Sequence, residues 1–106
     1  MGKWDNKTTE ELLEAICALK SKNEAKKFFR DLLTEQELME FGKRWQVARM
    51  LSKGKPYSEI ERATGLSSTT VARVSRWLNQ GMGGYKLMIQ RLSKTHHHNQ
   101  ALVRRG

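Results

Sequence analysis

The chain has little of what many small domains use to hold themselves together. Its 106 residues include one cysteine and one proline, and only 38% of them are hydrophobic. Because Cys17 has no partner for an internal disulfide, we expect a cytoplasmic protein. No stretch approaches the roughly twenty apolar residues of a membrane span, and we expect no charged-then-apolar leader. We expect one domain with a modest core, which burial against a second copy would help to stabilise.

Residue groups that carry catalysis or bind metals are also missing. The sequence has no phosphate-binding glycine loop, no paired carboxylates in a protected setting and no arrangement of serine with histidine. Cys17 lies on a predicted apolar helix face, where a cysteine is most often a small buried hydrophobe. His96, His97 and His98 are adjacent and lack an acidic or cysteine partner, which does not suit a metal site. We therefore expect neither an enzyme nor a bound cofactor.

Acidic residues are nearly absent from the second part of the chain. Residues 43–106 contain thirteen Lys and Arg but only two acidic residues, Glu59 and Glu61, for a net charge of +11. Residues 1–42 contain seven basic and nine acidic residues, which gives −2 and completes the total of +9. Such one-sided charge is typical of a protein that binds a polyanion. A membrane surface fits less well, because no helix pairs a broad apolar face with a lysine-rich one.

Residues 57–78 predict two short helices joined by a tight turn. Ser58 is expected to cap the first helix, and its inner face would carry Ile60 and Ala63. Gly65 provides the positive φ that a chain often needs when it leaves a helix.

The second helix of this pair, residues 67–78, is capped by Ser67 and has Val71, Val74 and Leu78 at helical spacing. The opposite face is small, polar and basic, with Ser68, Thr69, Ala72, Arg73 and Arg76. This arrangement is typical of a helix-turn-helix whose second helix enters the major groove of double-stranded DNA. An ordinary corner between two helices is the alternative, and the basic charge favours DNA.

The candidate DNA contacts differ in chemistry. Ser68, Thr69 and Ala72 are small enough to let the helix sit deep in a groove, and Arg73 is the long donor that could reach a guanine or a phosphate. The expected phosphate contacts, which would set the register, are Lys43, Lys55, Ser58, Arg62, Thr70 and Arg76. Few long side chains are available to contact base edges. Discrimination between DNA sequences is therefore expected to depend partly on bridging water and on DNA shape.

The remaining sequence predicts an all-α fold of about six helices. The first helix would begin at a capping box of Thr8 with Glu11, and the second would begin at Asn23. A further capping box, Thr34 with Glu37, would begin the third. The inward faces of the first two helices are expected to carry Leu12, Leu13, Ile16, Cys17, Leu19, Phe28, Phe29, Leu32 and Leu33.

The C-terminal part predicts a short amphipathic helix over residues 85–92 followed by a disordered basic tail over residues 93–106. Residues 1–92 would then form the single helical domain.

Residues 28–78 resemble the Trp repressor family of bacterial transcriptional regulators. The matching pieces are Leu32–Thr34, Phe41–Arg44, Leu51–Gly54 and Thr69–Ser75. The resemblance implies an intertwined, all-helical homodimer whose two helix-turn-helix units meet successive major grooves, about 34–36 Å apart.

In the founding member of that family, tryptophan is the corepressor. The resemblance places Thr34, Arg44 and Arg73 on positions that line its tryptophan pocket, whereas Val74 and Trp77 replace a glycine and a small serine. Because the larger side chains would fill the pocket, the resemblance implies a regulator that does not use tryptophan. One of the chain's own tryptophans would then hold the helix-turn-helix, residues 57–78 (the reading head), in place. Alternatively, the two arginines would simply bind phosphate.

These features favour a sequence-specific DNA-binding regulator, a homodimer that represses transcription by occluding a promoter, with no effector identified. The alternative is a non-enzymatic protein-interaction or assembly module, which the large apolar residues Trp4, Phe28 and Phe29 support. RNA binding is a third interpretation, but the basic half lacks the aromatic platform that single-stranded RNA recognition uses.

Overall fold

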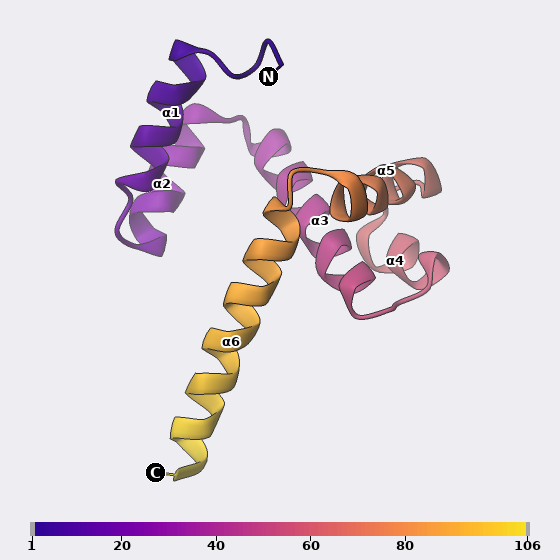
Figure 1. Ribbon diagram of the computed structural model, residues 1–106. Coiled ribbons are helices and arrows are strands. Elements are labelled where there is room, and N and C mark those ends of the chain that lie inside the picture. The colour runs from indigo at the N-terminus through magenta and orange to yellow at the C-terminus, as the bar shows by residue number, and fades with distance from the viewer. Residues whose placement is uncertain (1, 106) are drawn as a thin grey trace. The chain divides into compact units, whose positions relative to one another are not determined.

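A computed structural model describes residues 2–105, and it describes side chains as far as residue 94. Within that range the chain forms six α-helices and no strand (Figure 1), which confirms the all-α prediction. The helices are α1 (Lys7–Cys17), α2 (Lys22–Leu32), α3 (Glu35–Ser52), α4 (Tyr57–Thr64), α5 (Ser68–Gln80) and α6 (Gly84–Arg105). The chain divides into two compact units, residues 1–39 and 40–106, which are described separately. None of the described helices is both long enough and apolar enough to cross a bilayer.

Helix α1 begins before the predicted capping box. The Asn6 side chain accepts from the Thr9 N–H at 3.0 Å, and the Thr9 hydroxyl accepts from the Asn6 N–H at 3.0 Å. The prediction of Thr8 with Glu11 was therefore wrong. The asparagine lies two residues earlier and can satisfy the first free N–H groups equally well.

Helix α2 also begins earlier than predicted. The Ser21 hydroxyl accepts from the Glu24 N–H at 3.1 Å, so Ser21 caps the helix and the choice of Asn23 was wrong. The Glu24 carboxylate in turn accepts from the Lys20 N–H at 2.9 Å. These two bonds fix the turn between α1 and α2.

The capping box that begins α3 is confirmed. The Glu37 N–H donates to the Thr34 hydroxyl at 3.1 Å, and the Thr34 N–H donates to Glu37 Oε1 at 2.9 Å. Because the Thr34 N–H and hydroxyl favour the ionised carboxylate, the pKa of Glu37 lies below its ordinary value of 4.5.

The first unit has no buried residue in either of its complete helices. Leu12 and Ile16 are half-buried, as expected for an inward face, but Leu13 is 46% exposed and Leu32 is 45% exposed. Cys17 is exposed as well, so its prediction as a buried hydrophobe is wrong for a single chain. Several apolar side chains of α1 and α2 therefore remain exposed in a single chain.

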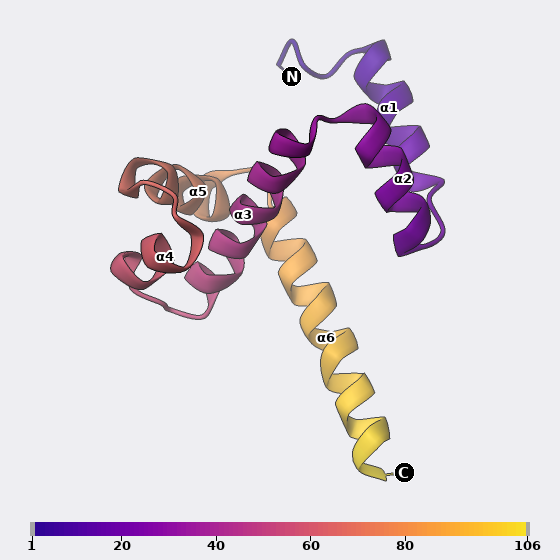
Figure 2. The ribbon, with the colours of Figure 1, turned by 180° about the vertical axis from the view of Figure 1, so that it is seen from behind.

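The second unit has its core where α3, α4 and α5 meet (Figure 2). The fully buried side chains are Val47, Ala48, Ile60, Val71 and Val74. Leu78 is 8% exposed, so the predicted apolar stripe of α5 is confirmed.

The turn between α4 and α5 matches the prediction at its glycine and departs from it on α4. Gly65 has φ of 72°, and the Ser67 hydroxyl accepts from the Thr70 N–H at 3.3 Å. Helix α4 begins at Tyr57 after Pro56, without a side-chain cap, so Ser58 lies inside the helix and its role as the cap was wrong.

Thr64 rather than Ala63 completes the inner face of α4. Ala63 is exposed, whereas Thr64 is buried, donates to the Ile60 carbonyl at 2.8 Å and accepts from the Leu66 N–H at 3.2 Å. The neighbouring position lies about 100° around the helix. That rotation places the threonine over the core, where its hydroxyl ties the end of α4 to the turn.

Helix α6 is longer than predicted. It does not end at Leu92 but continues to Arg105 (Figure 1), so the disordered tail predicted from residue 93 is wrong for the backbone through residue 105. Its first turn is fastened to α3, because the Tyr85 and Trp45 rings stack with centroids 6.2 Å apart.

We expect Gly65→Ala to destabilise the chain by about 1–2 kcal/mol, because an L-residue is strained at positive φ. Equilibrium urea unfolding measures the change. Gly84→Ala is the control, since Gly84 lacks a positive φ and an added Cβ would meet nothing within 4 Å. Equal losses for the two variants would contradict the role assigned to Gly65.

Glu37→Gln should lower stability at neutral pH, and the difference from the parent chain should vanish in acid. A carboxyl whose pKa is lowered in the folded state stabilises above its unfolded pKa, near 4.5. That contribution is lost as the pH falls through the folded pKa. Urea midpoints measured between about pH 7 and pH 3 check this, and a pH-independent difference would contradict it.

Candidate nucleic-acid interface

The outward face of α5 is fixed by the side chains that point the other way. Because Val71 and Val74 are fully buried, the opposite side of the helix must face solvent. The five side chains predicted there are all exposed: Ser68, Thr69, Ala72, Arg73 and Arg76. The structure thus confirms their shared exposed face, and their contacts with DNA stay a prediction.

The first turn of α5 presents hydroxyl groups beside this face. Thr70 is half-buried, and its hydroxyl lies 3.2 Å from the Ser67 hydroxyl that caps the helix. A phosphate contact from Thr70, as predicted, would therefore use a hydroxyl already engaged in the cap. Ser68 and Thr69 have no such restriction among the described contacts.

Three of the remaining predicted phosphate contacts, Ser58, Arg62 and Lys55, lie on α4 and the turn before it. All three are exposed. Lys55 Nζ lies 3.7 Å from Glu59 Oε1, an exposed ion pair of low strength that a phosphate could replace. Lys43, on α3, is only half-exposed, so it has less freedom to reach a ligand than Lys55.

The second unit has almost no negative charge to offset these cations. Glu61 is the last acidic residue of the sequence, so α5 and α6 contain none. Within the described part of the chain, Arg62, Arg73 and Arg76 make no ion pair. The positive potential over α5 is therefore set by uncompensated guanidinium groups, which attract a polyanion.

Arg44 and Trp77, predicted near a ligand pocket, contact each other. The Arg44 guanidinium carbon lies 5.8 Å from the centroid of a Trp77 ring and 5.5 Å from that of Phe41. The same guanidinium also pairs with Glu40 at 3.1 Å, one turn earlier on α3. The four-residue spacing of Glu40 and Arg44 was a sequence signal for this pair, and it was missed. Arg44 is thus held between two aromatic side chains.

The other predicted pocket residues differ in burial and in the unit to which they belong. Val74 is fully buried in the core beside Val71, and its predicted place at a filled ligand pocket stays a prediction. Arg73 is exposed on the outward face of α5. Thr34 lies in the first unit, and its proximity to Arg73 stays a prediction.

No cluster of three or more His, Cys, Asp or Glu that could hold a metal occurs among the residues described. The side chains of His96, His97 and His98 lie outside the described residues. One residue that the sequence reasoning missed is Thr64, which ties the helix-turn-helix together. A hydroxyl directly before the glycine that ends a helix was the available signal.

Comparison with known proteins extends the resemblance beyond residues 28–78. The profile of the family described as Trp repressor protein matches residues 7–93. The Bacillus subtilis (strain 168) protein YerC is 39% identical over 95 residues, which cover 90% of this chain and 91% of YerC.

Two solved structures agree with that match. The crystal structure of a TrpR-like protein from Eubacterium eligens ATCC 27750 is 38% identical and gives a TM-score of 0.83 over 86% of this chain and 94% of that one. A Staphylococcus aureus structure is 35% identical and gives 0.81 over 86% and 91%.

We expect isothermal titration with L-tryptophan to give no binding heat, because Trp77 already occupies a face of Arg44. A second indole could bind there only after the Trp77 ring had been displaced. A micromolar heat signal at one site per chain would contradict this expectation.

Proposed function

Because the chain belongs to the Trp repressor family, we propose that it is a homodimeric, sequence-specific DNA-binding regulator that represses transcription by occluding a promoter. One observation carries the proposal. The apolar stripe of α5 is buried, so a small and basic face points outward, and no acidic residue follows Glu61 in the sequence.

In the proposed complex, the N-terminal turn of α5 lies in the major groove. Ser68, Thr69 and Ala72 let the helix approach the base edges, where hydroxyls can donate or accept and methyl groups can touch thymine. Arg73 reaches a guanine or a phosphate. Arg62 and Lys55 hold the backbone and set the register, together with the remaining predicted phosphate contacts.

The proposal of a homodimer is supported by apolar surface that one chain leaves uncovered. Leu13 and Leu32 in the first unit and Phe41 in the second are each nearly half exposed. Trp45, Trp77, Tyr85 and other apolar residues of the second unit line a hollow of about 590 Å³. Burial of such surface favours association, and the two reading heads of a dimer would meet successive grooves.

A regulator of this kind would not need tryptophan to form its reading head. The contact between Arg44 and Trp77 joins α3 to α5 within one chain. The orientation of the outward face of α5 would therefore not depend on a bound ligand. Cation–π contacts of partly exposed groups contribute about 0.5–1 kcal/mol, which is enough to bias a helix position and too little to fix a fold.

An assembly module is the competing function, and Trp4 is the observation that favours it. Its side chain is 53% exposed in the first unit, where a partner protein could cover it. Such a module would not need the uncompensated positive charge of the second unit.

A gel-shift or anisotropy titration separates these functions. A mixed-sequence duplex should bind with an affinity that falls steeply as salt rises, whereas the matched single strands should bind much more weakly. Equal binding of duplex and single strands would favour RNA-like recognition. Absence of binding to either, with retained dimerisation, would favour the assembly module.

Arg73→Ala should weaken binding to a selected operator by about 1–3 kcal/mol and relax the preference at one base position. Lys55→Ala should weaken all duplexes similarly and reduce the salt slope by about one unit, since it removes a phosphate contact. The measurement is anisotropy with operator and scrambled duplexes over a range of salt.

The matched control for both substitutions is Lys26→Ala. Lys26 is an exposed lysine of α2, in the part of the chain with net negative charge. It should change neither affinity nor salt slope. If Lys26→Ala and Lys55→Ala had the same effect, the basic residues would be acting only through the total charge of the protein.

A further inference from the structure

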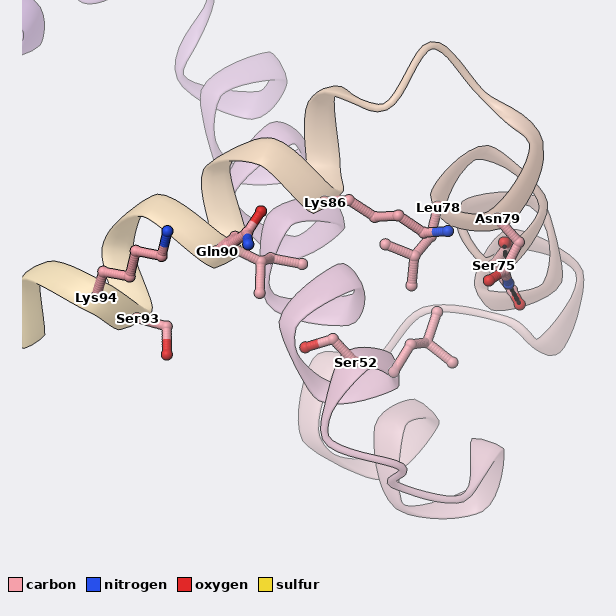
Figure 3. Close-up of a pocket in the computed structure, with 10 residues that line it drawn as sticks. Ser52, Ser75, Leu78, Asn79, Lys86, Gln90, Ser93 and Lys94 are labelled. Carbon is pink, nitrogen blue, oxygen red and sulfur yellow. Dashed lines mark hydrogen bonds between the residues drawn. The ribbon is translucent and has the colours of Figure 1, made fainter. Parts of the chain in front are cut away.

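A hollow of about 580 Å³ lies between the end of α3, the second half of α5 and α6 (Figure 3). Leu51, Leu78 and Ile89 supply its apolar floor, and Leu78 and Ile89 are largely covered by the core. Its volume lies within the range of about 300–1,000 Å³ that small-molecule sites occupy. The hollow could therefore accept the body of a small organic molecule.

Helix α5 lines one side of the hollow with two polar side chains. Asn79 Nδ2 donates to the Ser75 carbonyl at 2.9 Å and lies 3.5 Å from the Ser75 hydroxyl oxygen (Figure 3). Because that hydroxyl oxygen accepts from Asn79, its own hydrogen remains available to a ligand oxygen.

Helix α6 lines the other side with Lys86, Gln90 and Lys94, which are spaced four residues apart and so share one face. In Figure 3 the Lys86 side chain extends from α6 toward Ser75 and Asn79 on α5. Neither lysine has an ion pair with any described residue, and none of the lining residues is acidic. Two ammonium groups therefore face the hollow without a counter-charge from the described side chains.

We propose that this hollow binds an organic phosphate monoester with a small apolar body. The phosphoryl group would bind the Lys86 ammonium and accept from the Ser75 hydroxyl, while the body would rest on Leu78 and Ile89. Lys94 lies two helical turns farther along α6, about 12 Å along the axis, and would add only a longer-range attraction. Charge-assisted hydrogen bonds to phosphate are among the strongest that a protein surface makes. A neutral molecule would leave the two lysines unused, and a cation would be repelled by them.

The position of the hollow argues against its being a further contact for the DNA backbone. Ser75 is half-buried and Leu78 is buried, so the floor of the hollow lies below the outward face of α5, whereas Lys86 and Lys94 at its edge are exposed. The backbone of a duplex is a broad convex surface that exposed side chains reach more easily than a recess does. Binding of the lysines to DNA is therefore the alternative that the experiment must separate.

A ligand in this hollow would touch both α5 and α6. If its contacts differ between free and DNA-bound positions of α5, it changes DNA affinity, and DNA changes its affinity by the same factor. This regulatory consequence rests on the proposed DNA-binding function. The binding site itself does not, and its test contains no DNA.

The test is a titration of the full chain with phenyl phosphate, inorganic phosphate and benzyl alcohol. Binding is measured by calorimetry and by shifts of the amide NMR signals of Ser75, Asn79 and Gln90. Phenyl phosphate should bind once per chain and shift these signals. Inorganic phosphate should bind about tenfold more weakly, because it lacks the apolar body. Benzyl alcohol should not bind.

Lys86→Gln should weaken phenyl phosphate about tenfold or more, and Lys94→Gln should weaken it less, because Lys94 lies farther from the phosphoryl group. Lys53→Gln is the matched control, because Lys53 is an exposed lysine of the same unit that does not line this hollow. It should leave the affinity unchanged.

Absence of phenyl phosphate binding would overturn the site, as would equal losses in all three lysine variants. If a separate titration with duplex DNA shows that the lysine variants weaken only DNA binding, Lys86 and Lys94 belong to the DNA backbone contacts instead, which would also overturn the site. Because the titration is done without DNA, its failure would leave the proposed DNA-binding function standing.

Discussion

The burial of Ile60, Val71 and Val74 against Val47 is the constraint on which the second unit depends. These side chains are fully buried, so α5 has only one orientation that keeps them covered. A rotation by one residue, about 100°, would put Val71 into solvent and turn polar side chains toward the core. The same packing that stabilises the unit therefore decides that Arg73 points outward. The candidate DNA-binding surface is a consequence of the core rather than a separate feature.

The two units of the chain differ in net charge and in how well their apolar side chains are buried. The second unit has a closed core and a large excess of positive charge, which suits recognition of a polyanion. The first unit has no buried residue in α1 or α2 and leaves Leu13 and Leu32 exposed, which suits burial against another chain. The second unit also leaves Phe41 and Trp77 exposed, so uncovered apolar surface occurs in both units, whereas the excess of positive charge belongs to the second alone. Arg44, held between Phe41 and Trp77, makes the second unit independent of a bound aromatic ligand in this account.

The sequence was sufficient for the parts of the structure that depend on periodicity. Val71 and its partners on α5 were predictable because one helix repeat fixes which face is covered. The caps of α1 and α2 were not, since Asn6 and Thr8, for example, can both satisfy a helix N-terminus and only the folded chain selects one. Thr64 was missed because a one-residue difference changes the face of α4. The contact of Trp77 with α3 was beyond local reasoning, since it depends on how two helices pack.

Hydrogen exchange of the full chain, with and without a duplex that it selects from random sequence, tests the central claim most directly. The account predicts that amides at the start of α5, residues 68–76, become more protected when the duplex is bound, together with those of α4. The amides of α1 should change least. Protection confined to α1 and α2, with residues 68–76 unchanged under saturating duplex, would contradict it.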